Sequence, residues 1–471
     1  MSPAQHAAAI LAWYAAQDPT ALATAYAAAE GALLAHAAAL AEAADSADPE
    51  RQRAGIQALF AGLVEPLNDS FAPAARWLYH RLFTHIVWRA CQRDAALAAR
   101  LASFGVASEE ELCARHARVR ACRQPLPAGC RRLAVLSRVT IGADVLLTSV
   151  LLQRLRQRYP DAELVVLGDG KLQALFGGFP GVRVRPVSYA RRGALGERLR
   201  AWRQLADDLA ALQADAVLAP DSRLDQLGIL PLGDEQRYRL WENVQPDERP
   251  RSLVDLLNAW CDAVLGADEP ALPRLAFDGD TQALSARFRA ALGDAPLCAV
   301  KLDHGGNPAK ALPRQQECAL LAGLAARGWR ILLDRGFGAE ELANSDALLD
   351  ALGWRVCELD DSGQGLGRAV AQLARDELAA AQVIRFHGSI GGWAAALAAC
   401  RYAIAYDSVG QHLAAALDIP LSVPFTGWTD PRFPLAWQPR GRGPVRVIAI
   451  PTEQRAEARW VEAVLASVPP P

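Results

Sequence analysis

The sequence predicts an α/β protein in which an all-helical domain precedes two doubly wound domains with parallel sheets. Two observations lead to this prediction. From about residue 130 short apolar runs alternate with helical patterns, which is typical of βαβ units, whereas the first 125 residues carry helical patterns only. The length of 471 residues fits three domains, and an apolar fraction of 52% is ample for their cores.

Residues 1–125 form the predicted all-helical domain. The stretch 21–44 is rich in Ala and Leu, which are strong helix formers. In the stretch 73–101 apolar residues recur at intervals of three and four, the spacing of one buried helix face: Trp77, Leu78, Leu82, Ile86 and Val87. Two interpretations are open for this domain, a bundle that packs on the rest of the chain or a module that binds an acceptor or a partner.

Residues 130–280 form the second predicted domain, which begins after prolines and a glycine at 125–129. Its apolar runs predict strands at 132–139, 163–168, 182–187 and 215–220. Helices are predicted at 145–159, 171–176, 195–212 and 253–265. The Pro-, Asp- and Gly-rich stretch 268–280 indicates an interdomain linker.

Residues 295–450 form the third predicted domain, and 451–471 a C-terminal helix and tail. Strands are predicted at 297–302, 329–334, 354–359, 382–386, 402–406 and 421–425, and helices at 314–326, 339–352, 368–380, 392–400, 412–417 and 453–467. Ligands of such sheets bind beyond the carboxyl ends of the strands, where the strand order reverses. Two such domains that face each other across a cleft provide a preferred substrate site.

Charge and cysteine usage exclude several classes of protein. The formal net charge of −2 lacks the basic excess of a nucleic-acid binder, so no nucleic-acid partner is expected. No apolar run reaches the roughly 20 residues that cross a bilayer. A cleaved signal requires a basic region before its apolar stretch, and no such region precedes the first apolar stretch here. The nine cysteines form no C-x-x-C pair, which argues against a zinc site or a disulfide framework and fits a reducing cytoplasm.

The strongest local signal is the segment 406–431. Asp407 and Ser408 occupy the N-cap position of a predicted helix, Gly410 permits a tight turn, and His412 lies in the first helical turn. Exposed N–H groups at such a helix start form an anion site, and an imidazole beside them can bind a phosphate or a ribose. The alternative is an ordinary capped helix with a structural histidine.

A second segment follows the first strand of the third domain. It supplies Gly305, Gly306 and Asn307, and then Lys310 ahead of a helix. Glycines let the backbone approach a pyrophosphate, and a lysine offers a mobile cation. The spacing is not that of a Walker A loop.

A third segment follows the first strand of the second domain. The chain turns through Gly142, and Asp144 stands where the next helix begins. Asp144 is interpreted either as a helix N-cap or as a carboxylate at the lip of the cleft.

In this order the three segments resemble the ADP-heptose-dependent heptosyltransferases of glycosyltransferase family 9, over roughly residues 132–439. The similarity is carried by IGADVLL with the later YPDAELVVLG, by AKALP around Lys310, by DSVGQHLAAALDIP, and by FTGWTDP, which contains Thr426 and Gly427. The resemblance implies a GT-B fold, with the acceptor on the domain 130–280 and the nucleotide sugar on the domain 295–450.

The resemblance also implies roles for single residues. Asp144 is expected to act as general base on the acceptor hydroxyl, and Lys310 to steady the donor's diphosphate. Asp407, Ser408 and His412 are expected to hold the donor's phosphates and sugar. The expected donor-binding set is completed by Gly305, Gly306, Asn307, Gly410, Thr426 and Gly427.

The implied reaction is an inverting transfer that needs no metal and no cofactor beyond the nucleotide sugar, with ADP-heptose as the expected donor. A glycan, a glycolipid and a protein remain open as acceptors. The expected location is the cytoplasm, with peripheral association at the inner face of the inner membrane as an open alternative.

Two other functions compete with this one. Ala143 lengthens the family's Gly-Asp turn by one residue, which favours a nucleotide-sugar-binding protein that has lost catalysis. The additional helical domain is also compatible with an assembly or scaffold subunit.

Overall fold

The computed structural model of the chain describes residues 1–471 except 190–192, 246–248, 294, 306, 361–380 and 429. The chain divides into two compact units. The first comprises Met1–Val139, Leu155–Asp169 and Arg185–Asp268, and the second Thr140–Arg154, Gly170–Val184 and Glu269–Pro471. The division of the chain into three domains stays a prediction; in the structure the helical region shares a unit with the first sheet.

The helical region of the first unit contains no strand within its described residues. Its helices are α1 (Pro3–Ala15), α2 (Leu22–Ala44), α3 (Pro49–Leu59), α4 (Glu65–Asp69), α5 (Pro73–Gln92), α6 (Ala95–Ser103) and α7 (Glu109–Ala121). The predicted helix 73–101 is two helices. The first ends at Gln92, and Asp94 starts the second, because its carboxylate accepts hydrogen bonds from the backbone N–H groups of Ala96 and Leu97 and thereby caps α6.

The first sheet has the strand order β3-β2-β1-β4-β5. The strands are β1 (Arg132–Leu136), β2 (Glu163–Gly168), β3 (Val182–Pro186), β4 (Ala216–Pro220) and β5 (Tyr238–Trp241), and the helices α11 (Leu195–Leu212) and α12 (Leu253–Leu265) belong to the same part of the chain. The sequence pattern missed β5. A run of four residues that includes Arg239 carries too short an apolar signal, and parallel pairing with β4 determines its conformation.

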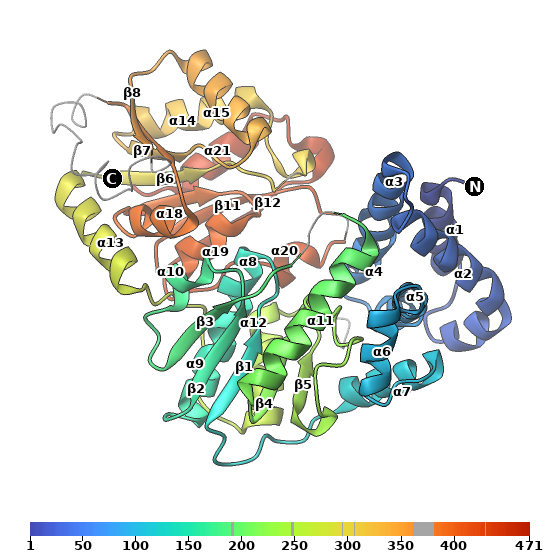
Figure 1. Cartoon of the computed structure of the whole chain (residues 1–471). Coiled ribbons are helices and arrows are strands. Elements are labelled where there is room, and N and C mark those ends of the chain that lie inside the picture. Colours follow the sequence, from blue (N-terminus) through green and yellow to red (C-terminus); the bar gives the residue numbers. More distant parts are fainter. Residues whose placement is uncertain (190–192, 246–248, 294, 306, 361–380, 429) are drawn as a thin grey trace. The chain divides into compact units, whose positions relative to one another are not determined.

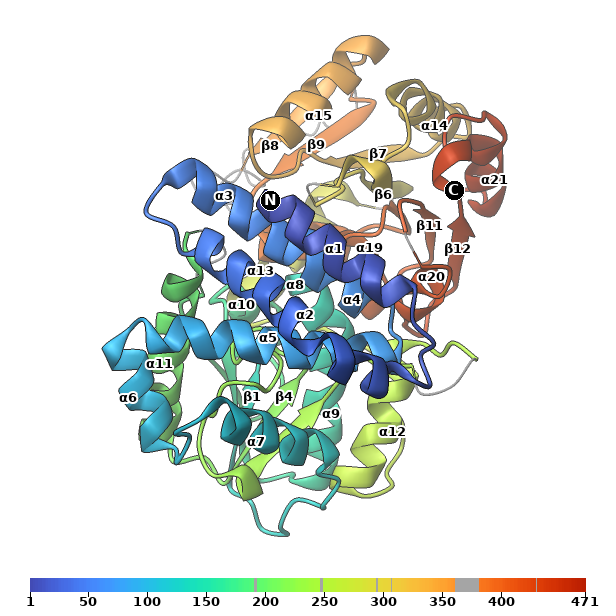
Figure 2. The same cartoon turned by 90° about the vertical axis from the view of Figure 1, so that its right-hand side faces the viewer.

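The helical region and the first sheet share one hydrophobic core. Leu78, Phe83 and Leu97 of the helices are buried in the same cluster as Leu136 and Leu240 of the strands. Helices α5 and α6 contact α11, and α7 contacts β5 (Figure 2). The helical region therefore does not close a core of its own, which favours the interpretation as a bundle that packs on the sheet.

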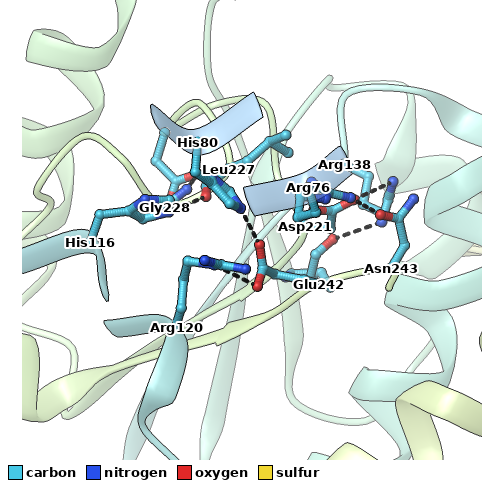
Figure 3. A network of polar contacts seen from close by, with 12 residues as sticks. Arg76, His80, His116, Arg120, Arg138, Asp221, Leu227, Gly228, Glu242 and Asn243 are labelled. Atoms are coloured by element: carbon cyan, nitrogen blue, oxygen red, sulfur yellow. Dashed lines mark hydrogen bonds and ion pairs between the residues drawn. The ribbon is translucent and has the colours of Figure 1, made fainter. Parts of the chain in front are cut away.

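Buried charges reinforce this packing at the carboxyl ends of β4 and β5 (Figure 3). Arg76 of α5 forms an ion pair with Asp221, which follows β4, at 3.2 Å, and also donates to Asn243, which follows β5. Arg138 contacts the other oxygen of Asp221 at 3.2 Å. Removing one partner from a buried pair leaves an uncompensated charge, so these contacts fix where α5 lies on the sheet.

A second group of buried side chains lies beside the first (Figure 3). His80 of α5 and Arg120 of α7 bind the two oxygens of Glu242 at 2.6 and 2.8 Å. The ring of His116 lies 4.3 Å from that of His80, and its Nε2 is 3.2 Å from the carbonyl oxygen of Leu227. Burial lowers the pKa of both histidines well below the usual value, and neighbouring positive groups lower it further.

The second unit contains a sheet with the order β12-β11-β10-β6-β7-β9-β8, in which each pair of neighbouring strands is parallel. Its strands are β6 (Leu297–Lys301), β7 (Arg330–Asp334), β8 (Val356–Asp360), β9 (Val383–His387), β10 (Tyr402–Ala405), β11 (Leu421–Phe425) and β12 (Val445–Ala449). The sequence pattern missed β12, since half-buried edge strands give weak signals. The predicted helix 368–380 lies outside the described residues.

Helices cover both faces of this sheet (Figure 1). One group packs with the apolar cluster that contains Val300, Ile331 and Ile404: α14 (Arg314–Ala326), α15 (Ala339–Leu352) and α21 (Arg459–Ser467). On the other face lie α13 (Gly279–Leu292), α18 (Ile390–Leu397) and α19 (Val409–Ala416). No helix in the described part of the chain is both long enough and apolar enough to span a membrane.

The buried histidines of the first unit predict a pH effect on stability. Because the folded-state pKa of each histidine is depressed, the unfolded state binds more protons than the folded state once the pH falls below the unfolded pKa of about 6.5. The histidines' contribution to the free energy of unfolding is therefore highest above that pH and decreases as the pH falls. We expect His116→Gln to lose less stability than the wild type between pH 7 and pH 5, by up to about 2 kcal/mol.

The measurement is the change in urea unfolding free energy between the two pH values in each protein. A difference between proteins is required because Asp225 and Glu317, whose pKa values burial raises to about 6 and about 7, act in the opposite direction. Equal pH dependence in both proteins would contradict the prediction.

Candidate functional site

The topology of the second sheet selects one place for a ligand. From β6 the chain continues to β7 on one side, and it later returns to β10 on the other side of β6. The order therefore reverses between β6 and β10, which pair in parallel with Lys301 opposite Ala405. Two of the segments singled out in the sequence, 302–310 and 406–412, follow these two strands. They meet at the position where doubly wound sheets bind ligands.

An ion pair joins the two segments. The Nζ of Lys310 lies 2.5 Å from Oδ2 of Asp407 and 3.5 Å from its carbonyl oxygen. The other carboxylate oxygen of Asp407 accepts a hydrogen bond from Nε2 of Gln411 at 2.8 Å. Lys310 ends a short 3-10 helix (Pro308–Lys310) that begins at Asn307, whose side chain accepts from the N–H of Ala309. About a quarter of the lysine side chain is exposed, so Asp407 fixes the position of the ammonium while the ammonium stays accessible to a ligand.

Helix α19 begins at this ion pair. Ser408 is its N-cap: the hydroxyl accepts from the N–H of Gly410 at 3.3 Å and donates to Asp303 at 2.7 Å. Asp303, which lies in the segment after β6, therefore belongs to the site together with the predicted residues. Gly410 is required for a packing reason that the sequence did not predict. A Cβ at this position would lie 2.6 Å from the side chain of Lys301.

Lys301 is a buried cation beneath the site. It contacts Asp334 directly and Asp303 at 3.4 Å. Burial alone would lower the pKa of Lys301, but the two carboxylates outweigh burial and raise it. The lysine therefore stays charged and binds Asp303, which in turn holds the N-cap serine of α19.

His412 lies in the first turn of α19 and is buried. Burial lowers its pKa to about 3, and the nearby charge of Lys310 acts in the same direction. The imidazole is therefore neutral at pH 7. Its Nδ1 has no hydrogen-bond partner among the described residues, and the same is true of Oγ1 of Thr426 and Oε1 of Gln411. Buried polar atoms without partners are costly, so their presence here indicates a place for a polar ligand.

The loop after β11 also approaches Lys310. Gly427 has a φ of +81°, and a Cβ there would lie 2.7 Å from the carbonyl carbon of Ala309 and 2.8 Å from the backbone nitrogen of Lys310. Its N–H donates to Thr452 at 3.2 Å. Gly427 is thus brought against the backbone of Lys310, and Thr426 precedes it in the same loop. Gly305 also has a positive φ, of +58°, but faces open space, and Gly306 lies outside the described residues.

The segment that carries Asp144 belongs to the same unit as α19. The short helix α8 (Ile141–Ala143) contacts α19, and a Cβ at Gly142 would lie 3.2 Å from the ring of His412. Asp144 opens a π-helical turn (Asp144–Thr148) and is fully buried. Its Oδ1 accepts a hydrogen bond from Thr148 at 2.7 Å.

The interpretation of Asp144 as a helix N-cap is wrong. Thr140 occupies the N-cap position, and the backbone N–H of Asp144 already donates to the carbonyl oxygen of Thr140 at 3.0 Å. Asp144 has helical backbone angles and continues the helix instead of starting it.

A pocket of about 210 Å³ opens at the carboxyl ends of β6 and β7. Its polar lining includes Asp303 and His304 from the segment after β6, Arg335 from the segment after β7, and Glu317 from the first turn of α14. Burial raises the pKa of Glu317 to about 7. The sequence pattern pointed to neither the pocket nor Glu317, because helix α14 is brought to the strand ends only by the tertiary fold.

Metal ligands do not gather in the part of the chain that the structure describes. No three His, Cys, Asp or Glu side chains there lie close enough together to hold an ion. The carboxylates of the site, Asp303 and Asp407, pair with Lys301 and Lys310. The remaining polar groups are a neutral histidine, hydroxyls and backbone N–H groups, which together with the partly exposed ammonium of Lys310 suit a phosphate ester.

The comparisons with known proteins give the fold. No protein-family model matches the sequence, and no curated protein does so. Among solved structures, the family 9 glycosyltransferase of Veillonella parvula has 14% sequence identity and a TM-score of 0.51, over 72% of this chain and 98% of its own. The chain has the fold of this enzyme. The predicted α/β class, two doubly wound sheets with a helical N-terminal region, is confirmed.

Two heptosyltransferases among the solved structures give similar values. ADP-heptose LPS heptosyltransferase II of E. coli has 17% identity and a TM-score of 0.49, over 71% of this chain and 98% of its own. The E. coli heptosyltransferase WaaC with ADP has 18% identity and a TM-score of 0.48, over 72% and 100%. At such identities the likeness is one of fold.

Alanine substitutions at Gly427 and Gly305 distinguish the effect of a steric clash from that of backbone strain. We expect Gly427→Ala to destabilise the protein more than Gly305→Ala. Both positions have a positive φ, which costs an L-residue about 1–2 kcal/mol, but only Gly427 faces backbone atoms within 3 Å. Thermal unfolding of the two variants beside the wild type measures the difference. Equal melting temperatures for the two variants would show that the loop after β11 does not pack on the Lys310 segment.

Proposed function

We propose that the chain is a glycosyltransferase that binds a nucleoside diphosphate sugar at the β6–β10 switch point and transfers the sugar with inversion and without a metal ion. The observation that carries the proposal is the Lys310–Asp407 ion pair beside the neutral imidazole of His412 at the start of α19, whose Nδ1 has no hydrogen-bond partner among the described residues. A diphosphate can accept hydrogen bonds from the ammonium, from the helix N–H groups and from the hydroxyl of Thr426.

The same groups suit the departure of the diphosphate. The acceptor oxygen attacks the anomeric carbon while the bond from that carbon to the diphosphate oxygen breaks, and the electron pair leaves with the diphosphate. Negative charge on the leaving oxygens grows in this step, so a fixed ammonium and a helix N-terminus lower the barrier. Asp407 keeps the ammonium in place when the site is empty. Neutral His412 adds a hydrogen bond and no competing charge.

Asp144 is the proposed base that takes the proton from the acceptor hydroxyl. Its segment packs against α19 through Gly142, two residues before the carboxylate. General-base catalysis requires the acceptor to reach a carboxylate that is buried and bonded to Thr148. We propose ADP-heptose as donor and a glycan, glycolipid or protein as acceptor, in the cytoplasm, on the strength of the sequence resemblance.

A second candidate function is a nucleotide-sugar-binding protein without catalysis. One observation favours it: Asp144 is fully buried and bonded to Thr148, which suits a structural carboxylate as well as a base. This candidate shares the donor site and differs only in turnover.

Donor binding tests the proposed site. In a thermal-shift screen of ADP-, GDP- and UDP-sugars, a donor at 100 times its dissociation constant should add about 2.7 kcal/mol of stability. We expect Lys310→Ala to weaken binding of that donor about 10- to 100-fold, since a charge-assisted contact is lost. Lys171→Ala, at an exposed lysine of the same unit, is the matched control. Unchanged affinity in Lys310→Ala would remove the diphosphate from this site.

Turnover separates the two candidate functions. For the transferase we expect Asp144→Asn to reduce release of the nucleoside diphosphate about 10²- to 10⁴-fold, the range of general-base catalysis, and to leave donor affinity within about twofold. The measurement is donor hydrolysis or transfer followed by nucleotide release, together with calorimetric binding. A wild-type protein that binds the donor and releases no nucleotide with any acceptor offered would favour the second candidate.

A further inference from the structure

A tyrosine and a glutamate lie between the pocket at β6 and β7 and the Lys310–Asp407 ion pair. Tyr406 immediately precedes Asp407, and its side chain is fully buried. Its hydroxyl donates to Oε1 of Glu317 at 2.7 Å and accepts from the N–H of Leu312 at 3.1 Å. Leu312 lies two residues after Lys310. One hydroxyl therefore links the segment of Asp407, the segment of Lys310 and helix α14.

Glu317 places the other end of this link in the pocket. Its side chain lines the pocket of about 210 Å³, and the structure gives it one hydrogen bond, from Tyr406. The second carboxyl oxygen can accept a hydrogen bond from a ligand hydroxyl or amino group when the side chain is ionised, and can donate one when it is protonated. A ligand that occupies the pocket would thus contact the group that orients Tyr406.

Packing and backbone hydrogen bonds hold Tyr406 in place in the protein interior. Tyr406 packs with Leu312 and Ile450 in a small apolar cluster, which keeps the ring and the Leu312 backbone together. The backbone N–H of Tyr406 donates to the carbonyl oxygen of Lys301 at 3.2 Å, and that of Ser408 donates to the carbonyl oxygen of Tyr406. A shift of the tyrosine therefore moves the start of α19 together with Asp407.

We propose that Glu317 and Tyr406 are positioning residues that couple the pocket to the Lys310–Asp407 ion pair, so that a nucleoside group in the pocket and the diphosphate at Lys310 are bound cooperatively. This inference rests on the proposed function, because it takes a nucleoside diphosphate as the ligand. Neither residue contacts the reacting atoms. Glu317 holds Tyr406, and Tyr406 holds the two segments that carry the ion pair at the spacing that the diphosphate requires.

The test is a double-mutant cycle on the full-length protein. Calorimetry measures the dissociation constants of ADP, GDP and UDP for the wild type, Tyr406→Phe, Lys310→Ala and the double variant. We expect Tyr406→Phe to weaken the best of these ligands about tenfold in the wild type and less than about twofold in the Lys310→Ala background. Such non-additivity arises only if the tyrosine acts on the ligand through the lysine segment.

Tyr402→Phe is the matched control. It removes a tyrosine hydroxyl from β10, the strand that Tyr406 directly follows, where the hydroxyl bonds to Ser422 at 2.8 Å and to the carbonyl oxygen of Ser467 at 3.0 Å. We expect it to lower the melting temperature and to leave the affinity for the nucleotide unchanged. If Tyr406→Phe acted only through a general loss of packing, Tyr406→Phe and Tyr402→Phe would have the same effect on nucleotide affinity.

Two substitutions of Glu317 complete the test. Glu317→Gln keeps an oxygen that accepts from Tyr406, so it should retain affinity within about threefold, whereas Glu317→Ala should match Tyr406→Phe. Equal effects of Tyr406→Phe in both backgrounds, or no effect in either, would overturn the coupling while the donor site stands. If none of the three nucleotides binds the wild type, the proposed function fails and the coupling fails with it.

Discussion

Parallel pairing of β6 with β10 is the constraint on which the candidate site depends. The two strands are far apart in sequence, yet their carboxyl ends meet because the chain returns to the opposite side of β6. That return places the segment of Lys310 next to the segment of Asp407. The ion pair, the N-cap of α19 and the contact of Gly427 with the lysine backbone all follow from this meeting.

Charge at this switch point is built up in two layers. Lys301 lies beneath the site and is neutralised by Asp334 and Asp303, so it acts as a fixed support for Ser408 and α19. Lys310, nearer the surface, has a single carboxylate partner among the described residues and is partly exposed. A buried ion pair is costly to break, whereas a partly exposed lysine can exchange its partner for a ligand anion at lower cost. The two lysines therefore differ in role, although Lys301 ends β6 and Lys310 lies in the segment that follows β6.

In the first unit the helical region is held by burial and by charge together. Its apolar residues share one core with the sheet, and Arg76 and His80 of α5 place polar groups against the ends of β4 and β5. The histidine pair is kept neutral by burial. Because ligands of a doubly wound sheet bind at the carboxyl ends of its strands, α5 covers part of the edge of the first sheet at which such ligands bind. This placement gives the helical region a direct structural connection to that edge of the sheet.

The sequence by itself determined the alternation of strands and helices and several helix bounds, including α11, α14 and α15, because periodicity and capping are local properties. The resemblance to family 9 also singled out Lys310, Asp407, Ser408 and His412 as expected donor-binding residues, and the structure brings Lys310 and Asp407 together. Only the tertiary structure decided the rest. The short strand β5 depends on its partner, and Asp144 continues a helix that Thr140 begins. Lys301 beneath Gly410 and Glu317 beside Tyr406 are contacts between residues distant in sequence, which no local pattern encodes.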